Sequence, residues 1–290
     1  MTLQPLDLRQ RADALAGRLP PLLADARHLA MTVMMGDHGR RRVGPGAEFW
    51  QFRPALPGDA ANRIDWRQSG KSEAHFIRER EWQAAQTVTF WVDPGRSMGF
   101  TSQPKVNPTK HERAISLSLA LAILLDRAGE RIGLAGDRSG RGEGQLMRMA
   151  GTLSDLATED YASPDLGSVP QRSLALIVSD FFAPIEALTR QITTATDRGV
   201  RGALLQINDP AEETFPFSGR TVFESMGGTL HYEVQRAGAL KSDYRERLLR
   251  RRAELADLAR ATGWQMMTHH TDQPAQSALL WLYGAIGRQA

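Results

Sequence analysis

Residues 87–98 read Thr-Val-Thr-Phe-Trp-Val-Asp-Pro-Gly-Arg-Ser-Met, and this stretch decides which fold the sequence predicts. Its first six residues are all β-branched or aromatic, a composition that is typical of a β-strand. Beyond it, strand-like and helix-like segments alternate along the chain. Alternation of this kind predicts an α/β fold with a doubly wound, mostly parallel sheet of the Rossmann type.

The other elements of this α/β pattern are expected from their apolar runs and periodicity. Further strands are expected at residues 131–135, 174–178, 202–207 and 264–267. Helices are expected at residues 110–128, 184–198, 240–262 and 277–286. Between the first two of these helices, Gly140, Gly142 and Gly144 alternate with polar residues. We expect a hairpin or a loose loop there, and no junction between a strand and a helix.

Residues 1–82 differ in pattern from the α/β region and are expected to pack on it as an N-terminal part. Apolar periodicity predicts helices over residues 6–34, with a break at Pro20-Pro21. A segment rich in Gly, Pro and Arg follows, and its Gly-Pro-Gly and Pro-Gly-Asp sequences are strong turn signals. We therefore divide the chain into residues 1–82 and a main domain of residues 83–290.

The composition excludes several classes of protein. The 290 residues carry 36 basic and 33 acidic side chains, and the two signs are interleaved along the chain. That pattern indicates a solvated surface, whereas a nucleic-acid-binding protein concentrates its positive charge on one face. The absence of cysteine excludes disulfides and thiolate zinc sites. No apolar stretch is long enough to span a bilayer, so we expect a soluble, cytoplasmic protein.

The residues that follow the strands are expected to form the functional site, because ligands of such sheets bind beyond the carboxyl ends of the strands. Asp93 follows the first strand and Ser97 comes four residues later, as in the D-x-S-x-S motif of a metal-dependent adhesion site. Asp180 follows the strand at residues 174–178 and must lie at the same edge of the sheet. Because Mg²⁺ prefers oxygen ligands, Asp93, Ser97 and Asp180 predict a weak Mg²⁺ site, which is degenerate because Gly95 replaces the first serine.

Two alternatives to this metal-assisted binding site remain open. The sequence Gly95-Arg96-Ser97-Met98-Gly99 also matches the G-x-S-x-G nucleophile elbow of a serine hydrolase. Asp180, and then His269 or His270, follow Ser97 in the order that the other members of such a triad require. Prolines after the motif argue against the helix that an elbow needs immediately behind its serine. The second alternative is a structural scaffold without a ligand.

Several phrases of the sequence resemble the domain of unknown function 58 family. The most specific are Pro57-Gly58-Asp59 and Arg63-Ile64-Asp65-Trp66. The others are His38-Gly39-Arg40-Arg41, Gly44-Pro45-Gly46-Ala47-Glu48-Phe49, Arg53, Arg78-Glu79-Arg80-Glu81, Ser179-Asp180-Phe181 and Asp209-Pro210-Ala211-Glu212-Glu213. The resemblance extends over most of the chain from about residue 25.

This resemblance implies a bacterial protein whose fold is like that of von Willebrand factor A domains. Proteins of the family are often encoded beside MoxR-type AAA+ ATPases and are thought to act with them in protein assembly or maturation. No defined enzymatic reaction is attached to the family. The resemblance therefore implies a non-enzymatic interaction protein whose partner is a MoxR-type ATPase.

The charged residues of the family phrases also have a physical interpretation. The residues that alternate in charge are Arg53, Asp59, Arg63, Asp65 and Arg67. Bidentate pairs between guanidinium and carboxylate groups among them would hold this loop in place. The other interpretation is that they present charges to a partner. Trp50 and Trp66 are expected to be packed, because aromatic residues so placed usually are.

Overall fold

The computed structural model describes residues 25–33, 51–55, 64, 66–70, 75–79, 85–157, 159–228 and 231–287. The chain divides into two units. The larger unit comprises Met1–Gly36 and Gln86–Ala290, and the smaller one comprises Asp37–Ala85. The described helix at residues 25–33 therefore belongs with the α/β region, whereas the sequence had grouped it with residues 1–82.

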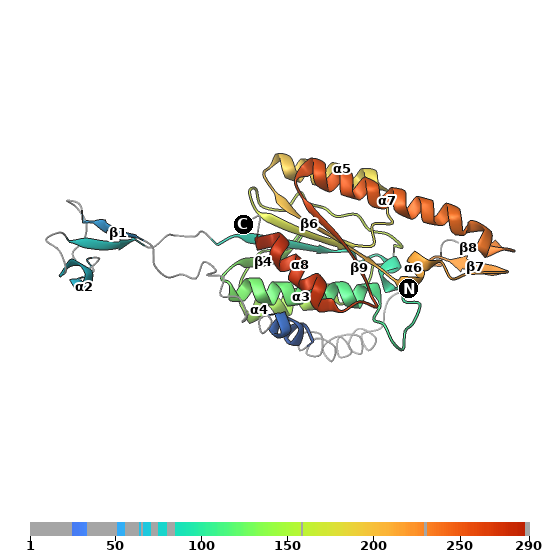
Figure 1. Cartoon of the computed structure of the whole chain (residues 1–290), viewed down its shortest axis with the longest axis horizontal. Helices are drawn as coiled ribbons and strands as arrows, with labels where there is room; N and C mark the ends of the chain where they lie inside the picture. The colour runs from blue at the N-terminus through green and yellow to red at the C-terminus, as the bar shows by residue number, and fades with distance from the viewer. Residues whose placement is uncertain are drawn as a thin grey trace, which may run out of the picture. The chain divides into compact units, whose positions relative to one another are not determined.

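The larger unit is built on a parallel sheet of five strands, in the order β4-β3-β5-β6-β9 (Figure 1). The strands are β3 (Thr87–Val92), β4 (Arg131–Leu134), β5 (Leu174–Ser179), β6 (Arg201–Asn208) and β9 (Gln265–His270). All four pairings between neighbouring strands are parallel. The predicted α/β fold with a doubly wound parallel sheet is confirmed, and all five strands lie within two residues of their expected starts.

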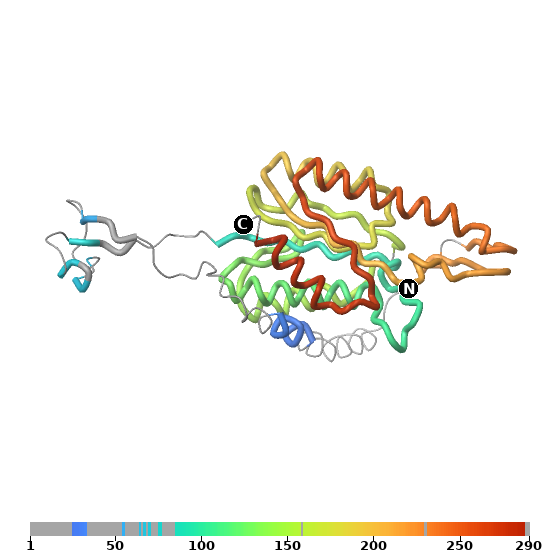
Figure 2. Tube along the Cα trace, in the orientation of Figure 1, coloured from blue at the N-terminus to red at the C-terminus, as the bar shows by residue number. Residues whose placement is uncertain are grey.

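Helices cover both faces of this sheet (Figure 1). One face carries α3 (Lys110–Arg127), α4 (Glu143–Leu153) and α8 (Ala275–Gly287), and their apolar side chains form the larger core cluster. The other face carries α5 (Ile185–Asp197) and α7 (Lys241–Thr262), which form the smaller cluster. The tube in Figure 2 shows the blue helix at residues 25–33 against the first group. Its apolar residues Ala26, Leu29, Ala30 and Val33 are buried in the larger cluster.

The junction between β4 and α4 differs from the sequence prediction. Gly140 forms an isolated antiparallel bridge with Ile132, so part of the predicted hairpin is present. However, Gly142 is the residue before α4, where it adopts a positive φ of 78° that favours glycine. The glycines therefore do lead from a strand into a helix, and the prediction of a loose loop there was wrong.

A small structure beside the carboxyl ends of the strands was not predicted. It consists of the short helix α6 (Pro210–Thr214) and an antiparallel hairpin of β7 (Thr221–Glu224) and β8 (His231–Val234). After the hairpin, the short 3₁₀ helix η4 (Ala237–Leu240) leads directly into α7. This structure forms one side of the pocket described below.

The smaller unit contains β1 (Gln51–Pro54), paired antiparallel with β2 (Phe76–Glu79), and the short helix α2 (Trp66–Ser69). The indole of Trp66 meets the His75 ring edge-on, with 5.5 Å between centroids, yet the residue is 62% exposed. The expectation that Trp66 is packed was therefore wrong. Trp50, Asp59, Arg63, Asp65 and the side chain of Arg53 lie outside the described residues. Among the described helices, none is long and apolar enough to cross a membrane.

Candidate binding site at the carboxyl edge of the sheet

Asp93 and Asp180 lie at the same edge of the sheet, as the sequence predicts. Their strands β3 and β5 are neighbours, and Val92 is in register with Val178. The Asp93 amide donates a hydrogen bond to the Val178 carbonyl over 2.8 Å. The Ser179 hydroxyl, in turn, donates to Asp93 Oδ2 over 2.6 Å. Both carboxylates are buried.

The carboxyl group of Asp93 is held within the fold. Besides the bond from Ser179, its Oδ1 accepts a hydrogen bond from the Gly95 amide over 2.8 Å. Burial raises the pKa of Asp93 to about 6, and the negative charge of Asp180 adds to the increase, whereas the two hydrogen bonds oppose it. Asp93 therefore closes the loop after β3 and does not face an open site.

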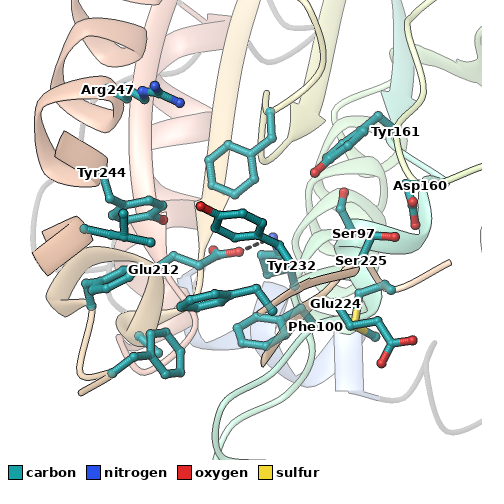
Figure 3. A pocket seen from close by; sticks show the side chains of 18 of the residues that line it. Ser97, Phe100, Asp160, Tyr161, Glu212, Glu224, Ser225, Tyr232, Tyr244 and Arg247 are labelled. Carbon is teal, nitrogen blue, oxygen red and sulfur yellow. Dashed lines mark hydrogen bonds and ion pairs between the residues drawn. The ribbon is translucent and has the colours of Figure 1, made fainter. Parts of the chain in front are cut away.

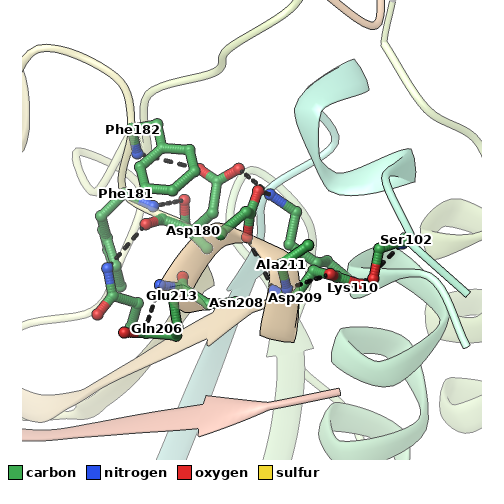
Figure 4. A network of polar contacts seen from close by, with 12 residues as sticks. Ser102, Lys110, Asp180, Phe181, Phe182, Gln206, Asn208, Asp209, Ala211 and Glu213 are labelled. Atoms are coloured by element: carbon green, nitrogen blue, oxygen red, sulfur yellow. Dashed lines mark hydrogen bonds and ion pairs between the residues drawn. The ribbon is translucent and has the colours of Figure 1, made fainter. Parts of the chain in front are cut away.

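Asp180 is neutralised by a buried lysine that the sequence analysis missed (Figure 4). Lys110 Nζ lies 2.8 Å from Asp180 Oδ2 and 2.7 Å from Glu212 Oε1, and its side chain is only 1% exposed. We call these three residues the Lys110 cluster. Burial lowers the pKa of Lys110, but the two carboxylates raise it by more, so the ammonium stays charged.

Aromatic rings complete the surroundings of this ammonium. Lys110 Nζ lies 5.0 Å from the centroid of the Phe182 ring and 5.9 Å from that of Phe100. A cation at such distances is attracted by the negative face of an aromatic ring. The edge of the sheet therefore already holds one cation between carboxylates and aromatic rings.

Two helix starts bring Lys110 and Glu212 together. Thr109 caps α3: its hydroxyl oxygen accepts a hydrogen bond from the Glu112 amide, and its backbone amide donates one to the Glu112 carboxylate. Lys110 is thus the first residue of α3, a position where the helix dipole disfavours a cation. Asp209 caps α6 in the same way, and its other oxygen accepts a hydrogen bond from the Ser102 amide. The sequence did contain a signal for this cluster: a lysine at the start of an otherwise apolar helix indicates that an acidic partner lies nearby.

The residues at this edge do not fit the predicted Mg²⁺ ion. Asp180 is paired with the Lys110 ammonium, and both oxygens of Asp93 accept hydrogen bonds. A side chain at Gly95, where the motif has its first serine, would begin 2.8 Å from the Asp160 carbonyl oxygen and 2.9 Å from Asp93 Oδ1. Within the described part of the chain, no group of three or more His, Cys, Asp or Glu side chains is placed to hold a metal ion. We therefore derive no metal-dependent step at this site.

A pocket of about 670 Å³ opens beside the Lys110 cluster (Figure 3). Eight of its nineteen lining residues are aromatic: Phe100, Tyr161, Phe182, Phe215, Phe217, Phe223, Tyr232 and Tyr244. Ser97, the third predicted site residue, also lines it, and its buried Oγ has no hydrogen-bond partner among the described residues. We call this the aromatic pocket. The sequence placed a site at this edge, but it missed the residues of β7, β8 and α7 that enclose it.

The described residues do not assemble a serine hydrolase triad around Ser97. His269 is fully buried, and neither of its ring nitrogens has a hydrogen-bond partner among the residues that the structure describes. Burial lowers the pKa of His269 to about 4, and the positive charge of Arg113 contributes to the decrease. His270 Nε2 instead contacts Glu213 Oε1 over 2.8 Å. Because Ser97 Oγ contacts no described base, the geometry does not favour the nucleophile-elbow alternative.

The fold and the pocket together define an α/β protein with a pocket at the carboxyl edge of a parallel sheet, which is where such folds bind ligands. A family model described as "Protein of unknown function DUF58" matches residues 51–254. The match covers more than half of the chain, which therefore belongs to this family. The predicted membership of the domain of unknown function 58 family is confirmed.

Relatives are found in mycobacteria. Uncharacterized proteins of Mycobacterium bovis and Mycobacterium tuberculosis are 24% identical over 282 residues, covering 88% of this chain and 86% of the relatives. Among solved structures, an aerotolerance-related membrane protein from Bacteroides fragilis matches with a TM-score of 0.40 and 12% identity. The conserved hypothetical protein BatB from Bacteroides thetaiotaomicron matches with a TM-score of 0.40 and 13% identity. Each match covers 70% of this chain and 100% of the solved one.

Proposed function

We propose that this chain is a non-enzymatic protein-interaction module that works with a MoxR-type AAA+ ATPase of the cytoplasm in protein assembly or maturation. The family resemblance suggests the partner and the von Willebrand factor A-like fold. The aromatic pocket is the observation that carries the proposed mode of binding. In this proposal, a segment of the ATPase or of its client enters the pocket directly, without a bridging metal ion.

The exposure of the pocket's aromatic residues supports binding of a protein. Tyr232 is 61% exposed on β8, although it lines the pocket. Met226, in the loop after β7, and Tyr161 are also exposed at the pocket. Large side chains that combine an apolar body with a hydroxyl group are enriched at the centres of protein interfaces. A single soluble domain gains nothing from exposing them beside a cavity.

The chemistry of the pocket supports binding over catalysis. Ser97 Oγ, the one hydroxyl in the predicted motif, lacks a base, and the cation at this edge is paired with two carboxylates. A nucleophile without an activating partner has little reactivity at neutral pH. The volume of about 670 Å³ fits a peptide segment with a few side chains, since ligand pockets range over roughly 300–1,000 Å³.

Co-purification of the full chain with a purified MoxR-type ATPase tests the proposal. The change is Tyr232→Ala, which removes an exposed ring from the pocket wall. Because tyrosine is often an interface hot spot, we expect the dissociation constant to increase by about tenfold or more. The measurement is the amount of ATPase retained, followed by titration calorimetry.

Tyr283→Ala is the matched control for this experiment. Tyr283 is also a tyrosine, is 41% exposed, and lies near the C-terminal end of α8, outside the pocket. We expect the control to bind the ATPase as the unaltered chain does. Equal binding by the Tyr232→Ala variant, or no binding by the unaltered chain, would contradict the proposal. Asp93→Ala is less suitable, because Asp93 is buried and its loss would disturb the loop after β3.

A further inference from the structure

We infer that the aromatic pocket receives a basic side chain, arginine or lysine, from an extended segment of the partner. This inference rests on the proposed function and names the chemistry that the pocket recognises.

The charges of the pocket are predominantly negative. Its lining contains four carboxylates, Asp160, Glu212, Glu224 and Asp243, and two cations, Lys110 and Arg247, which gives a net charge of −2. Lys110 is in addition paired with Asp180, which lies behind the wall. A concave, partly desolvated surface concentrates such a field and attracts a ligand of the opposite sign.

Burial and the neighbouring negative charges both raise the pKa values of two tyrosine hydroxyls that line the pocket. Burial raises the pKa of Tyr161, and the negative charges of Asp180 and Asp160 raise it further. Burial also raises the pKa of Tyr244, together with the negative charges of Glu212 and Asp180. Both side chains therefore keep their protons, and both remain neutral rings that can contact a cation.

The aromatic rings offer faces on which a second cation can lie. Tyr161, Tyr232 and Tyr244 come from three separate segments and surround the open part of the pocket (Figure 3). The Lys110 ammonium is already held at 5.0 Å from the Phe182 ring, so the same wall stabilises a cation inside the protein.

An acidic occupant would find one accessible cation among the described lining residues, Arg247. The Lys110 ammonium is 1% exposed and contacts two carboxylates, so it has no free charge to offer. Arg247 is exposed at the rim and is outnumbered by the carboxylates of the lining. An entering carboxylate would meet a net repulsion and would lose its hydration without compensation.

Opposite charge changes on one helix test the inference with the purified ATPase. Asp243 and Arg247 lie one turn apart on α7, and both line the pocket. For a basic occupant, Asp243→Lys should increase the dissociation constant by about tenfold, and Arg247→Glu should decrease it several-fold. Both effects should shrink in high salt, because the groups are exposed and are screened. The matched control is Asp197→Lys, an exposed charge at the end of α5 outside the pocket, which should leave the affinity unchanged.

The outcomes separate this inference from the proposed function. If Tyr232→Ala weakens the complex but Asp243→Lys strengthens it, the pocket binds the partner and the occupant is acidic, which overturns the inference alone. If Tyr232→Ala and both charge variants leave the affinity unchanged, the proposed function fails at this pocket. Circular dichroism of each variant confirms that α7 is intact before the affinities are compared.

Short peptides test the inference even if the ATPase is not the partner. The probes are pentapeptides of glycine, capped at both ends, whose central residue is arginine, lysine, glutamate or glutamine. We expect the arginine and lysine peptides to bind the full chain with a dissociation constant on the order of millimolar, and the glutamate peptide not to bind. Tyr232→Ala should abolish the binding. Equal binding of all four peptides, or tighter binding of the glutamate peptide, would overturn the inference.

Discussion

The Lys110 cluster and the aromatic pocket share one edge of the sheet, but they differ in whether their polar groups have ion-pair or hydrogen-bond partners. In the Lys110 cluster, the ammonium lies within 2.8 Å of each of two carboxylates, and Lys110 and Asp180 are almost completely buried. In the adjacent pocket, Tyr232 is exposed and Ser97 Oγ lacks a partner among the described residues. Charge content alone therefore does not identify a binding site, and large side chains exposed beside a cavity are the better indicator. We expect the cluster to determine stability and the pocket to determine binding.

Among the changes that test this comparison, removing the buried cation is expected to have the largest effect on stability. Lys110→Met leaves the buried Asp180 and the largely buried Glu212 without their counter-ion. We expect the free energy of unfolding to fall by about 3–5 kcal/mol, because a buried charge that loses its partner is strongly destabilising. Urea denaturation measures the change. The control is Lys105→Met at an exposed position, and a similar small effect for both would show that the cluster does not stabilise the fold.

A smaller effect is expected when the missing serine of the motif is restored. In Gly95→Ser, the new Cβ would contact the Asp160 carbonyl oxygen and Asp93 Oδ1, so the chain between Glu159 and Tyr161 must move. We expect a loss of about 1–3 kcal/mol of stability, as for other overpacked positions. Thermal unfolding with and without Mg²⁺ measures it. A Mg²⁺-dependent increase in the melting temperature would contradict our conclusion that the site does not fit a metal. Gly144→Ser, where nothing lies within 4 Å, is the control.

The smallest effect concerns the pH dependence of stability. Burial raises the pKa of Asp93 from 3.8 to about 6 in the folded state. The folded state therefore binds this proton more tightly, and the resulting stability is present below the lower pKa and is lost as the pH rises through the higher one. Lowering the pH from about 7 to about 5 should add about 1 kcal/mol from this group. Asp93→Asn should remove that contribution, and urea denaturation at both pH values measures it. An unchanged pH dependence in the variant would mean that Asp93 does not have this raised pKa.

The sheet could be predicted from the sequence because each strand carries its own evidence. Thr87–Val92 is made of strand-forming residues, and Leu174–Val178 is a continuous apolar run, which is enough to identify a buried parallel strand. Helix α4 was missed because its glycines suggested a turn. Its buried residues Leu146, Met149, Ala150 and Leu153 nevertheless have the spacing of one helix face. The turn-favouring glycines therefore concealed a helix that the spacing of its apolar residues indicates.

Only part of the candidate site could be predicted. The positions of Asp93, Ser97 and Asp180 follow from the ends of two parallel strands, because such ends meet at one edge. The contacts of Lys110 join residues 70 and 102 positions apart in the sequence, and no local pattern specifies which distant carboxylate a lysine will meet. The hairpin of β7 and β8 was missed because each strand has only four residues, too few for an alternating pattern to stand out in the sequence.

The cation at the carboxyl edge of the sheet is the Lys110 ammonium, which is covalently attached to the chain, unlike a bound metal ion. A dissociable ion occupies its ligands only in proportion to its free concentration, so its site empties in a chelator or in a depleted cell. A covalently attached charge is supplied once, at synthesis, and dilution cannot remove it. The shape of the carboxyl edge should therefore be the same at every magnesium concentration, so that recognition there depends on the partner alone.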